Sequence, residues 1–231
     1  MDWKKEYVSD IKWNGEISNK EEKEKVAEKI AEKVNDGDVI GFGSGSTSLL
    51  ATKAIAKRVK EENLNIIAIP TSHEIRLLCI SLGIPTTTLM DKKPDWSFDG
   101  ADEVNSDNWL IKGRGGAMFK EKLNIVNSKE SYILVDSSKF VTKLGEKFPV
   151  PIECFPQAIC SIKNELANKF PVKTMNLRLA KGKDGPVITE NGNFILDVVF
   201  EEIDQNLEKE LKSIVGVIET GLFIGYPVTI L

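Results

Sequence analysis

The segment DVIGFGSGSTS, residues 38–48, decides the fold that we predict for this chain. Its apolar run VIGF predicts a short buried strand, which passes directly into a turn of glycine and serine residues. Leu50, Ala54 and Val59 follow at helical spacing, so a helix should begin just after the turn. A strand, a glycine-rich turn and a helix N-terminus in this order can hold an anion, because unpaired N–H groups and the helix dipole point at it.

The turn matches neither of two common nucleotide-binding motifs. It lacks the lysine of a Walker A loop, and its third glycine comes one residue too early for a dinucleotide fingerprint. An ordinary capped helix start uses the same residue types, and for the isolated segment we weigh the two interpretations evenly. As an anion site, the turn would bind through Ser44, Gly45, Ser46 and Thr47.

Strands and helices alternate on both sides of this turn. The expected elements are an amphipathic helix from residue 19, strands at 64–70, 85–90, 96–99 and 131–136, and helices at 71–83 and from about 117. In the helix at 71–83, Ile75, Leu78 and Leu82 should face inward. This alternation is typical of the α/β class, and it predicts a Rossmann-like, mostly parallel sheet with helices on both faces. Ligands of such sheets bind beyond the carboxyl ends of the strands.

The pattern changes after about Phe148. Residues 149–220 show the order β-α-β-β-α-β, which predicts a smaller ferredoxin-like α+β domain. We expect the Rossmann-like catalytic domain at 19–148, completed by the apolar tail at 221–231, and an N-terminal extension at 1–18.

The segment DGADEVNSDNWLIKGRGGAMFKE, residues 99–121, concentrates acid, base, cation and glycine. Asp99 and Asp102 end a strand, and Lys112, a glycine-rich loop and Glu121 follow. Carboxylates in different environments can divide proton donation and acceptance, and a lysine can hold negative charge that develops on oxygen. Each residue alone fits an ordinary turn or a solvated helix face, but their crowding favours a site for a small hydroxylated anion.

Composition excludes several other classes of protein. A net charge of −4 gives no general attraction to nucleic acid or to a membrane surface, and no run of apolar residues is long enough to span a bilayer. Three cysteines without paired spacing indicate reduced thiols, and we expect a cytoplasmic protein. The single histidine, His73, excludes a multi-histidine metal centre and a histidine-based triad as the principal chemistry.

Four motifs in the same order carry a resemblance to a known family. The chain resembles type A ribose-5-phosphate isomerase from about Lys20 to Leu231, through GFGSGST, DGADEV, KGRGGAMFKEK and VDSSK. The resemblance implies interconversion of ribose 5-phosphate and ribulose 5-phosphate, in the non-oxidative branch of the pentose phosphate pathway. It also implies catalysis without a metal or organic cofactor, and a homodimer or homotetramer.

The resemblance also assigns roles to residues. Glu121 corresponds to the general base of the family, with Asp99, Asp102 and Lys112 as its catalytic partners. The further substrate-binding positions that it implies are Ser44–Thr47, Gly100, Ala101, Gly113, Arg114, Gly115 and Lys139. Arg114 departs from a loop that is often all small or apolar residues, and Lys120 replaces a common arginine.

Two alternatives remain to be weighed. A sugar-phosphate sensor could keep the same fold and pocket, but binding alone does not require the base Glu121. An amino-sugar phosphate deaminase of related fold is the other, although histidine should be prominent there. The sequence leaves open the choice between dimer and tetramer, the selectivity among pentose phosphates, the role of the extension, and whether Lys23 or Lys139 contacts the phosphate.

Overall fold

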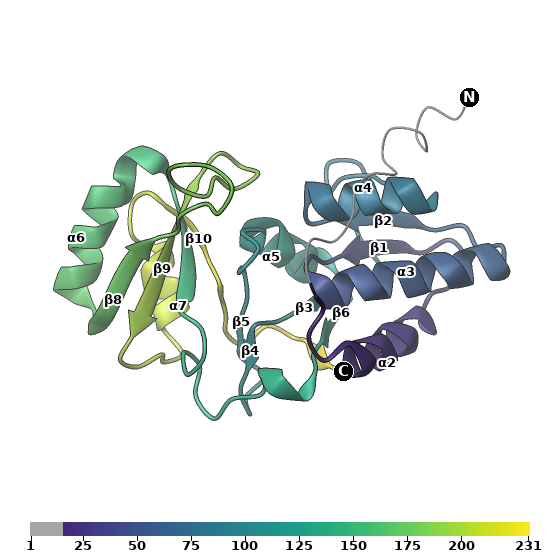
Figure 1. Ribbon diagram of the computed structural model, residues 1–231, viewed down its shortest axis with the longest axis horizontal. Coiled ribbons are helices and arrows are strands. Elements are labelled where there is room, and N and C mark those ends of the chain that lie inside the picture. The colour runs from purple at the N-terminus through teal and green to yellow at the C-terminus, as the bar shows by residue number, and fades with distance from the viewer. Residues whose placement is uncertain (1–15) are drawn as a thin grey trace. The chain divides into compact units, whose positions relative to one another are not determined.

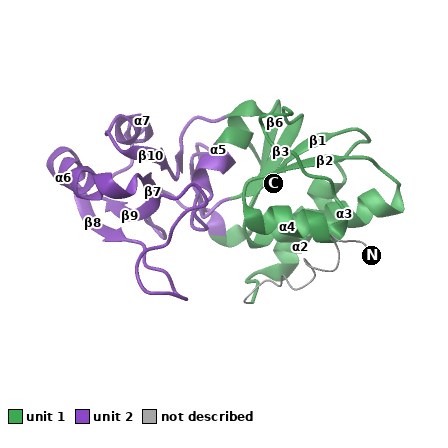
Figure 2. Cartoon of the chain, turned by 90° about the horizontal axis from the view of Figure 1, so that it is seen from above, with its two compact units in different colours: residues 1–100, 123–138, 227–231 green, residues 101–122, 139–226 purple. Residues whose placement is uncertain are grey.

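The computed structural model describes residues 16–231, which form two compact units (Figures 1 and 2). Of the described residues, unit 1 comprises 16–100, 123–138 and 227–231, and unit 2 comprises 101–122 and 139–226. Residues 1–15 of the predicted N-terminal extension lie outside the described part. In the short remainder, Ile17 packs against the core of unit 1.

Unit 1 is built on a five-stranded parallel sheet. Its strands, in spatial order, are β12 (Thr229–Ile230), β6 (Glu130–Leu134), β3 (Trp96–Gly100), β1 (Val39–Phe42) and β2 (Ile67–Pro70). The apolar tail thus returns to this sheet, where β12 pairs with β6.

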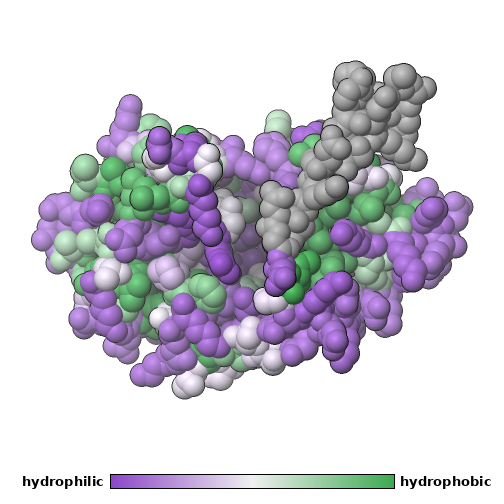
Figure 3. Space-filling model, viewed as in Figure 1, coloured by the Kyte–Doolittle hydropathy of each residue, from purple (hydrophilic) through white to green (hydrophobic). Residues whose placement is uncertain are grey.

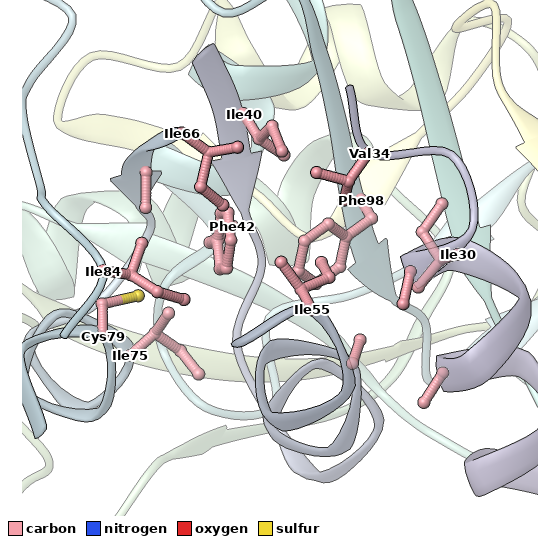
Figure 4. Close-up of a cluster of buried hydrophobic side chains, with 14 of the residues drawn as sticks. Ile30, Val34, Ile40, Phe42, Ile55, Ile66, Ile75, Cys79, Ile84 and Phe98 are labelled. Atoms are coloured by element: carbon pink, nitrogen blue, oxygen red, sulfur yellow. The ribbon is translucent and has the colours of Figure 1, made fainter. Parts of the chain in front are cut away.

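One face of the sheet packs on helices α2 (Lys20–Ala31), α3 (Ser46–Glu61) and α4 (His73–Leu82). Successive strand residues point to opposite faces, and Ile40, Phe42 and Phe98 point into this layer (Figure 4). The Phe42 and Phe98 rings meet edge to face with 4.9 Å between their centroids. Helices and strands that follow one another in sequence therefore share one apolar core.

The opposite face carries small side chains and a different helix. Gly41 and Ser97 lie there, and a Cβ atom at Gly41 would come within 3.0 Å of the Asn124 amide. Asn124 belongs to helix α5 (Met118–Asn127) and donates from Nδ2 to the Ile69 carbonyl at 2.8 Å. Helices cover both faces of the parallel sheet, as the sequence predicted.

Two local expectations in unit 1 were wrong. Residues 85–90 form no strand, and only Thr86 makes an isolated bridge to Ala68. The chain turns at once because the Thr88 hydroxyl donates to Asp91 at 3.0 Å and the Asp91 N–H donates to the Thr88 carbonyl. Leu82 is 39% exposed, since it is the last residue of α4 and extends past the core.

Unit 2 contains a four-stranded antiparallel sheet. Its strands, in spatial order, are β10 (Val217–Thr220), β7 (Val150–Cys154), β9 (Phe194–Phe200) and β8 (Val172–Leu177). Helix α6 (Ile159–Lys169) follows β7, and helix α7 (Leu207–Lys212) precedes β10. The predicted order β-α-β-β-α-β is therefore present, and the α/β fold class with a smaller ferredoxin-like part is confirmed.

A second, smaller sheet gathers segments that the sequence assigned to the first domain. It consists of β11 (Leu222–Phe223), β5 (Leu110–Ile111) and β4 (Glu103–Val104). The buried Glu103 carboxylate accepts from the N–H groups of Gly145, Lys147 and Phe148 at 2.6–2.7 Å. These contacts group residues 101–122, 139–148 and 221–226 with unit 2, whereas the domain bounds 19–148, 149–220 and 221–231 stay a prediction.

Hydrophobic side chains at the surface lie among hydrophilic ones in each unit (Figure 3). The most exposed large hydrophobic residues in the described part are Met90 and Val215, one in each unit. Isolated exposed apolar residues are normal for a protein surface. The expected homodimer or homotetramer therefore stays a prediction.

No helix of the described part is long and apolar enough to cross a bilayer.

Candidate active site

The serine turn of unit 1, residues 43–46, connects β1 to α3. Gly45 has φ +91° and precedes α3, whose first turn contains no acidic residue. The Ser44 hydroxyl bonds to Thr71 and Ser72, the residues that follow β2, at 2.7 and 2.8 Å. The polar residues after two neighbouring parallel strands thus meet at the carboxyl edge of the sheet, where ligands of such sheets bind.

Lys23 brings a positive charge to this turn. Lys23 is 3% exposed, and its ammonium lies 3.3 Å from the Ser46 hydroxyl and 3.7 Å from Asp136. Burial alone would raise the pKa of Asp136, but hydrogen bonds from the Ser138 hydroxyl and the Asn19 amide, with the Lys23 charge, hold that pKa below its usual value. The helix N-terminus, Lys23 and the hydroxyl groups together suit an anion.

Asp99 ends β3 and faces the same turn. Its Oδ1 accepts from the Ser44 N–H at 3.1 Å, the Gly100 N–H at 2.8 Å and the Ser48 hydroxyl at 3.5 Å. Asp99 is 4% exposed, and its carboxylate packs directly against Gly43. These bonds fix the carboxylate relative to the serine turn.

Gly43→Ala should disturb both the fold and Asp99. The new Cβ would lie 2.2 Å from Asp99 Oδ1 and 2.5 Å from its Cα, so the backbone must shift. We expect a loss of about 1–3 kcal/mol in unfolding free energy, as for other overpacked sites, together with reduced turnover. Thermal unfolding and steady-state rates measure the two effects. Gly182→Ala is the control because its Cβ meets nothing within 4 Å. Equal stability and equal turnover of the two variants would contradict the expected clash between position 43 and Asp99.

Unit 2 contains a buried ion pair between Lys112 and Glu121. The Lys112 ammonium lies 3.3 Å from Glu121 Oε2, and the two residues are 2% and 5% exposed. Lys112 follows β5, and its N–H donates to the Gly221 carbonyl, whereas Glu121 lies in the first turn of α5. A carboxylate held beside an ammonium in a largely desolvated place can accept a proton while the cation stabilises negative charge on oxygen.

The glycine loop lies between these two residues in sequence. Gly113 and Gly116 have φ of +90° and +82°, a conformation that glycine adopts without strain, and the Gly116 N–H donates to the Gly113 carbonyl. The Arg114 N–H donates to Asp102 Oδ2 at 3.2 Å. The loop that joins Lys112 to Glu121 in sequence therefore also contacts Asp102.

Two cations of unit 2 share one aromatic ring. The Lys139 ammonium and the Arg114 guanidinium lie 5.5 and 5.6 Å from the centroid of the Phe148 ring. Lys139 ends the short 3-10 helix η1 (Ser137–Lys139). Arg114, the residue that departs from the family pattern, thus projects toward the same ring as Lys139.

The structure divides the predicted site residues into two sets. Unit 1 holds Ser44, Gly45, Ser46, Thr47, Asp99 and Gly100, and unit 2 holds Ala101, Asp102, Lys112, Gly113, Arg114, Gly115, Glu121 and Lys139. In unit 1, Ser44 and Gly100 contact Asp99. In unit 2, Lys112 contacts Glu121, and Arg114 contacts Asp102. That both sets bind one ligand stays a prediction. Among residues 16–231, no group of three His, Cys, Asp or Glu side chains is placed to hold a metal ion.

Sequence reasoning missed the contacts of Lys122 and Arg178, two cations of unit 2 that pair with carboxylates. Lys122 was read as part of a motif, and Arg178 lies in a segment that we assigned to folding and assembly. Both contact carboxylates at least 19 residues away in sequence. No local pattern could have identified these contacts.

A parallel sheet with polar residues after its strands, and a buried lysine–carboxylate pair beside a glycine loop, are features expected of an α/β enzyme with acid–base chemistry. Comparison with known proteins identifies the family. The family model described as ribose 5-phosphate isomerase A (phosphoriboisomerase A) matches residues 67–231. The chain therefore belongs to the ribose 5-phosphate isomerase A family. This confirms the resemblance found in the motifs, and with it that the chain is an isomerase.

Individual relatives match over nearly the whole chain. Ribose-5-phosphate isomerase A of Methanocaldococcus jannaschii is 45% identical over 210 residues, which are 90% of this chain and 92% of that protein. Its solved structure superposes with a TM-score of 0.88 at 43% identity, covering 93% of this chain and 95% of the other. A solved D-ribose-5-phosphate isomerase in complex with phospho-erythronic acid also has a TM-score of 0.88, at 40% identity, covering 91% and 94% of the two chains.

Proposed function

We propose that this isomerase interconverts D-ribose 5-phosphate and D-ribulose 5-phosphate through a cis-enediolate, without a metal ion. The observation that carries the proposal is the buried pair of Glu121 and Lys112, 3.3 Å apart beside the glycine loop. Aldose-to-ketose conversion requires a base that reaches two neighbouring carbons and a cation that holds charge on oxygen. This pair supplies both.

In the proposed reaction Glu121 takes the proton from C2 of the aldose. The electron pair of that C–H bond forms the C1–C2 double bond, and the carbonyl oxygen on C1 becomes negatively charged. Lys112 and the loop N–H groups stabilise this charge, and loss of one such donor typically costs about a hundredfold to a thousandfold in rate. Glu121 then returns the proton to C1, and the proton of the O2 hydroxyl is transferred to O1, so that C2 becomes the ketone and O1 becomes a hydroxyl.

The remaining residues take supporting roles. Asp99 would move hydroxyl protons and assist ring opening, and Asp102 would orient the sugar hydroxyls or the loop. Ser46, Thr47 and the N-terminus of α3, with Lys23 or Lys139, would bind the phosphate. Binding energy from the phosphate can hold the reacting carbons at the base and so raise the rate. The relative solved with phospho-erythronic acid supports a phosphorylated sugar as the ligand.

A turnover assay tests the proposal and its alternatives together. The purified chain should convert ribose 5-phosphate to the ketose and should act far less well on unphosphorylated ribose, because the phosphate no longer contributes binding energy. Activity should survive exhaustive chelation. Tight binding of ribose 5-phosphate without turnover would favour a sensor, and ammonia release from an amino-sugar phosphate would favour a deaminase. Loss of activity on chelation would contradict the metal-free reaction.

A further inference from the structure

Arg178 lies just beyond the end of β8, in the part of the chain that the sequence assigned only to folding. Its guanidinium forms a bidentate pair with Asp197 of β9, with Nε 2.8 Å from Oδ2 and Nη2 bonded to Oδ1. The two side chains are 17% and 21% exposed. A paired guanidinium in this geometry is fixed in orientation, because two parallel hydrogen bonds remove its freedom to rotate.

The third nitrogen of this guanidinium contacts the glycine loop. Arg178 Nη1 donates to the Gly113 carbonyl at 3.1 Å and to the Arg114 carbonyl at 2.7 Å. Two successive peptide groups are thus held by one cation. The loop needs such a hold, since the glycines that let it turn also leave its backbone free to adopt other conformations.

Because a peptide group is planar, a fixed carbonyl also fixes the direction of the N–H of the next residue. In a trans peptide the carbonyl and the N–H point in opposite directions. The N–H opposite the Gly113 carbonyl belongs to Arg114 and donates to Asp102 Oδ2 at 3.2 Å. The N–H opposite the Arg114 carbonyl belongs to Gly115. One guanidinium therefore directs one N–H at a predicted catalytic carboxylate and sets the direction of the next N–H.

We propose that Arg178, oriented by Asp197, is a positioning residue for catalysis: it holds the Gly113 and Arg114 carbonyls and thereby places Asp102 and the Gly115 N–H for the isomerisation. The inference rests on the proposed function. Because Arg178 acts on groups that serve the reacting carbons, its loss should lower kcat and leave KM, to which the phosphate contributes, nearly unchanged. A displacement of about 1 Å at such groups can cost about a hundredfold in rate.

The test compares Arg178→Ala with Arg58→Ala. Arg58 is a matched control in unit 1, since it also pairs with a carboxylate, Glu62, and donates to a carbonyl, that of Ala31. We expect kcat on ribose 5-phosphate to fall about a hundredfold in Arg178→Ala, with partial recovery on adding methylguanidine at non-denaturing concentration, and no change in Arg58→Ala. Arg178→Lys should be intermediate, because an ammonium cannot bond bidentately to Asp197 while contacting both carbonyls.

The outcomes separate this inference from the function itself. If the unaltered chain does not turn over ribose 5-phosphate, the proposed function fails. If it does turn over ribose 5-phosphate, a kcat of Arg178→Ala equal to that of the unaltered chain overturns the positioning role. The role is also overturned if the loss of activity equals the fraction of unfolded protein and methylguanidine does not restore it. Should Arg178→Ala fail to fold, Asp197→Asn decides. This variant keeps Arg178 but removes the carboxylate charge that orients its guanidinium, so an unchanged kcat in Asp197→Asn rejects the proposal.

Discussion

Glu121→Gln is expected to lower kcat for aldose-to-ketose conversion by about 10²–10⁴-fold, the range in which a positioned general base contributes. The amide keeps the size of the side chain and can still bond to Lys112, whose ammonium lies 3.3 Å from the native carboxylate. It cannot take a proton from carbon. Substrate affinity should therefore stay close to that of the unaltered chain while turnover falls.

Two measurements distinguish a lost base from a damaged site. Calorimetric titration with ribose 5-phosphate reports binding, and exchange of the C2 hydrogen with solvent deuterium, followed by NMR, reports proton abstraction alone. Exchange and turnover should fall together. Glu165→Gln is the control, because Glu165 pairs with Lys169 on the exposed side of α6. Near-normal exchange in Glu121→Gln with unchanged affinity would mean that another group is the base.

Lys122→Met is expected to lower the free energy of unfolding by about 3–5 kcal/mol, the usual cost of leaving buried charges without their partner. The Lys122 ammonium contacts Glu208 at 2.6 Å and Glu219 at 2.8 Å, and it donates to the Thr220 and Leu222 carbonyls. Methionine keeps the length and apolar volume of the side chain. Urea unfolding at pH 7 should show the loss as a lower midpoint with an unchanged slope.

The stability difference should depend on pH in a defined direction. Burial would raise the pKa of Glu219, but Lys122, Lys212 and the Thr220 N–H together hold that pKa below its ordinary value of 4.5. A carboxyl whose pKa is lowered by folding adds stability above its unfolded pKa and loses it as pH falls through the lowered value. The difference in unfolding free energy between the unaltered chain and Lys122→Met should therefore be largest at pH 7 and should decrease below about pH 4.5.

Lys212→Met provides a matched comparison on the same carboxylate. Lys212 lies 2.9 Å from Glu219 Oε2, but its side chain is 37% exposed, so solvent screens the pair. Its loss should cost only about 0–1 kcal/mol, the range for exposed ion pairs. Equal losses from the two lysine variants would show that burial does not govern this network.

Much of the fold could be predicted because it depends on local pattern. The apolar run before Gly43 and the glycine at position 45 specify a strand and a turn within ten residues, and both are present. The prediction of a strand at 85–90 was wrong because the side chains of Thr88 and Asp91 form a hydrogen bond that makes the chain turn. The strand propensity of single residues does not include such a contact. The candidate residues, including the pair of Lys112 and Glu121, were predicted from motifs, whereas the partners of Lys122 and Arg178 were not predicted.

The sequence by itself determined the family, the α/β class, the serine turn and the set of acids and lysines, since these follow from the order of short motifs and the spacing of apolar residues. Apart from Lys112 and Glu121, which the motifs already named as catalytic partners, only the tertiary structure decided which charged side chains pair. Consecutive residues of a helix point in different directions, so Lys120, Glu121 and Lys122 pair with Glu190, Lys112 and Glu208 respectively. Two of these partners lie 70 or more residues away in sequence, and only the folded chain brings them within reach.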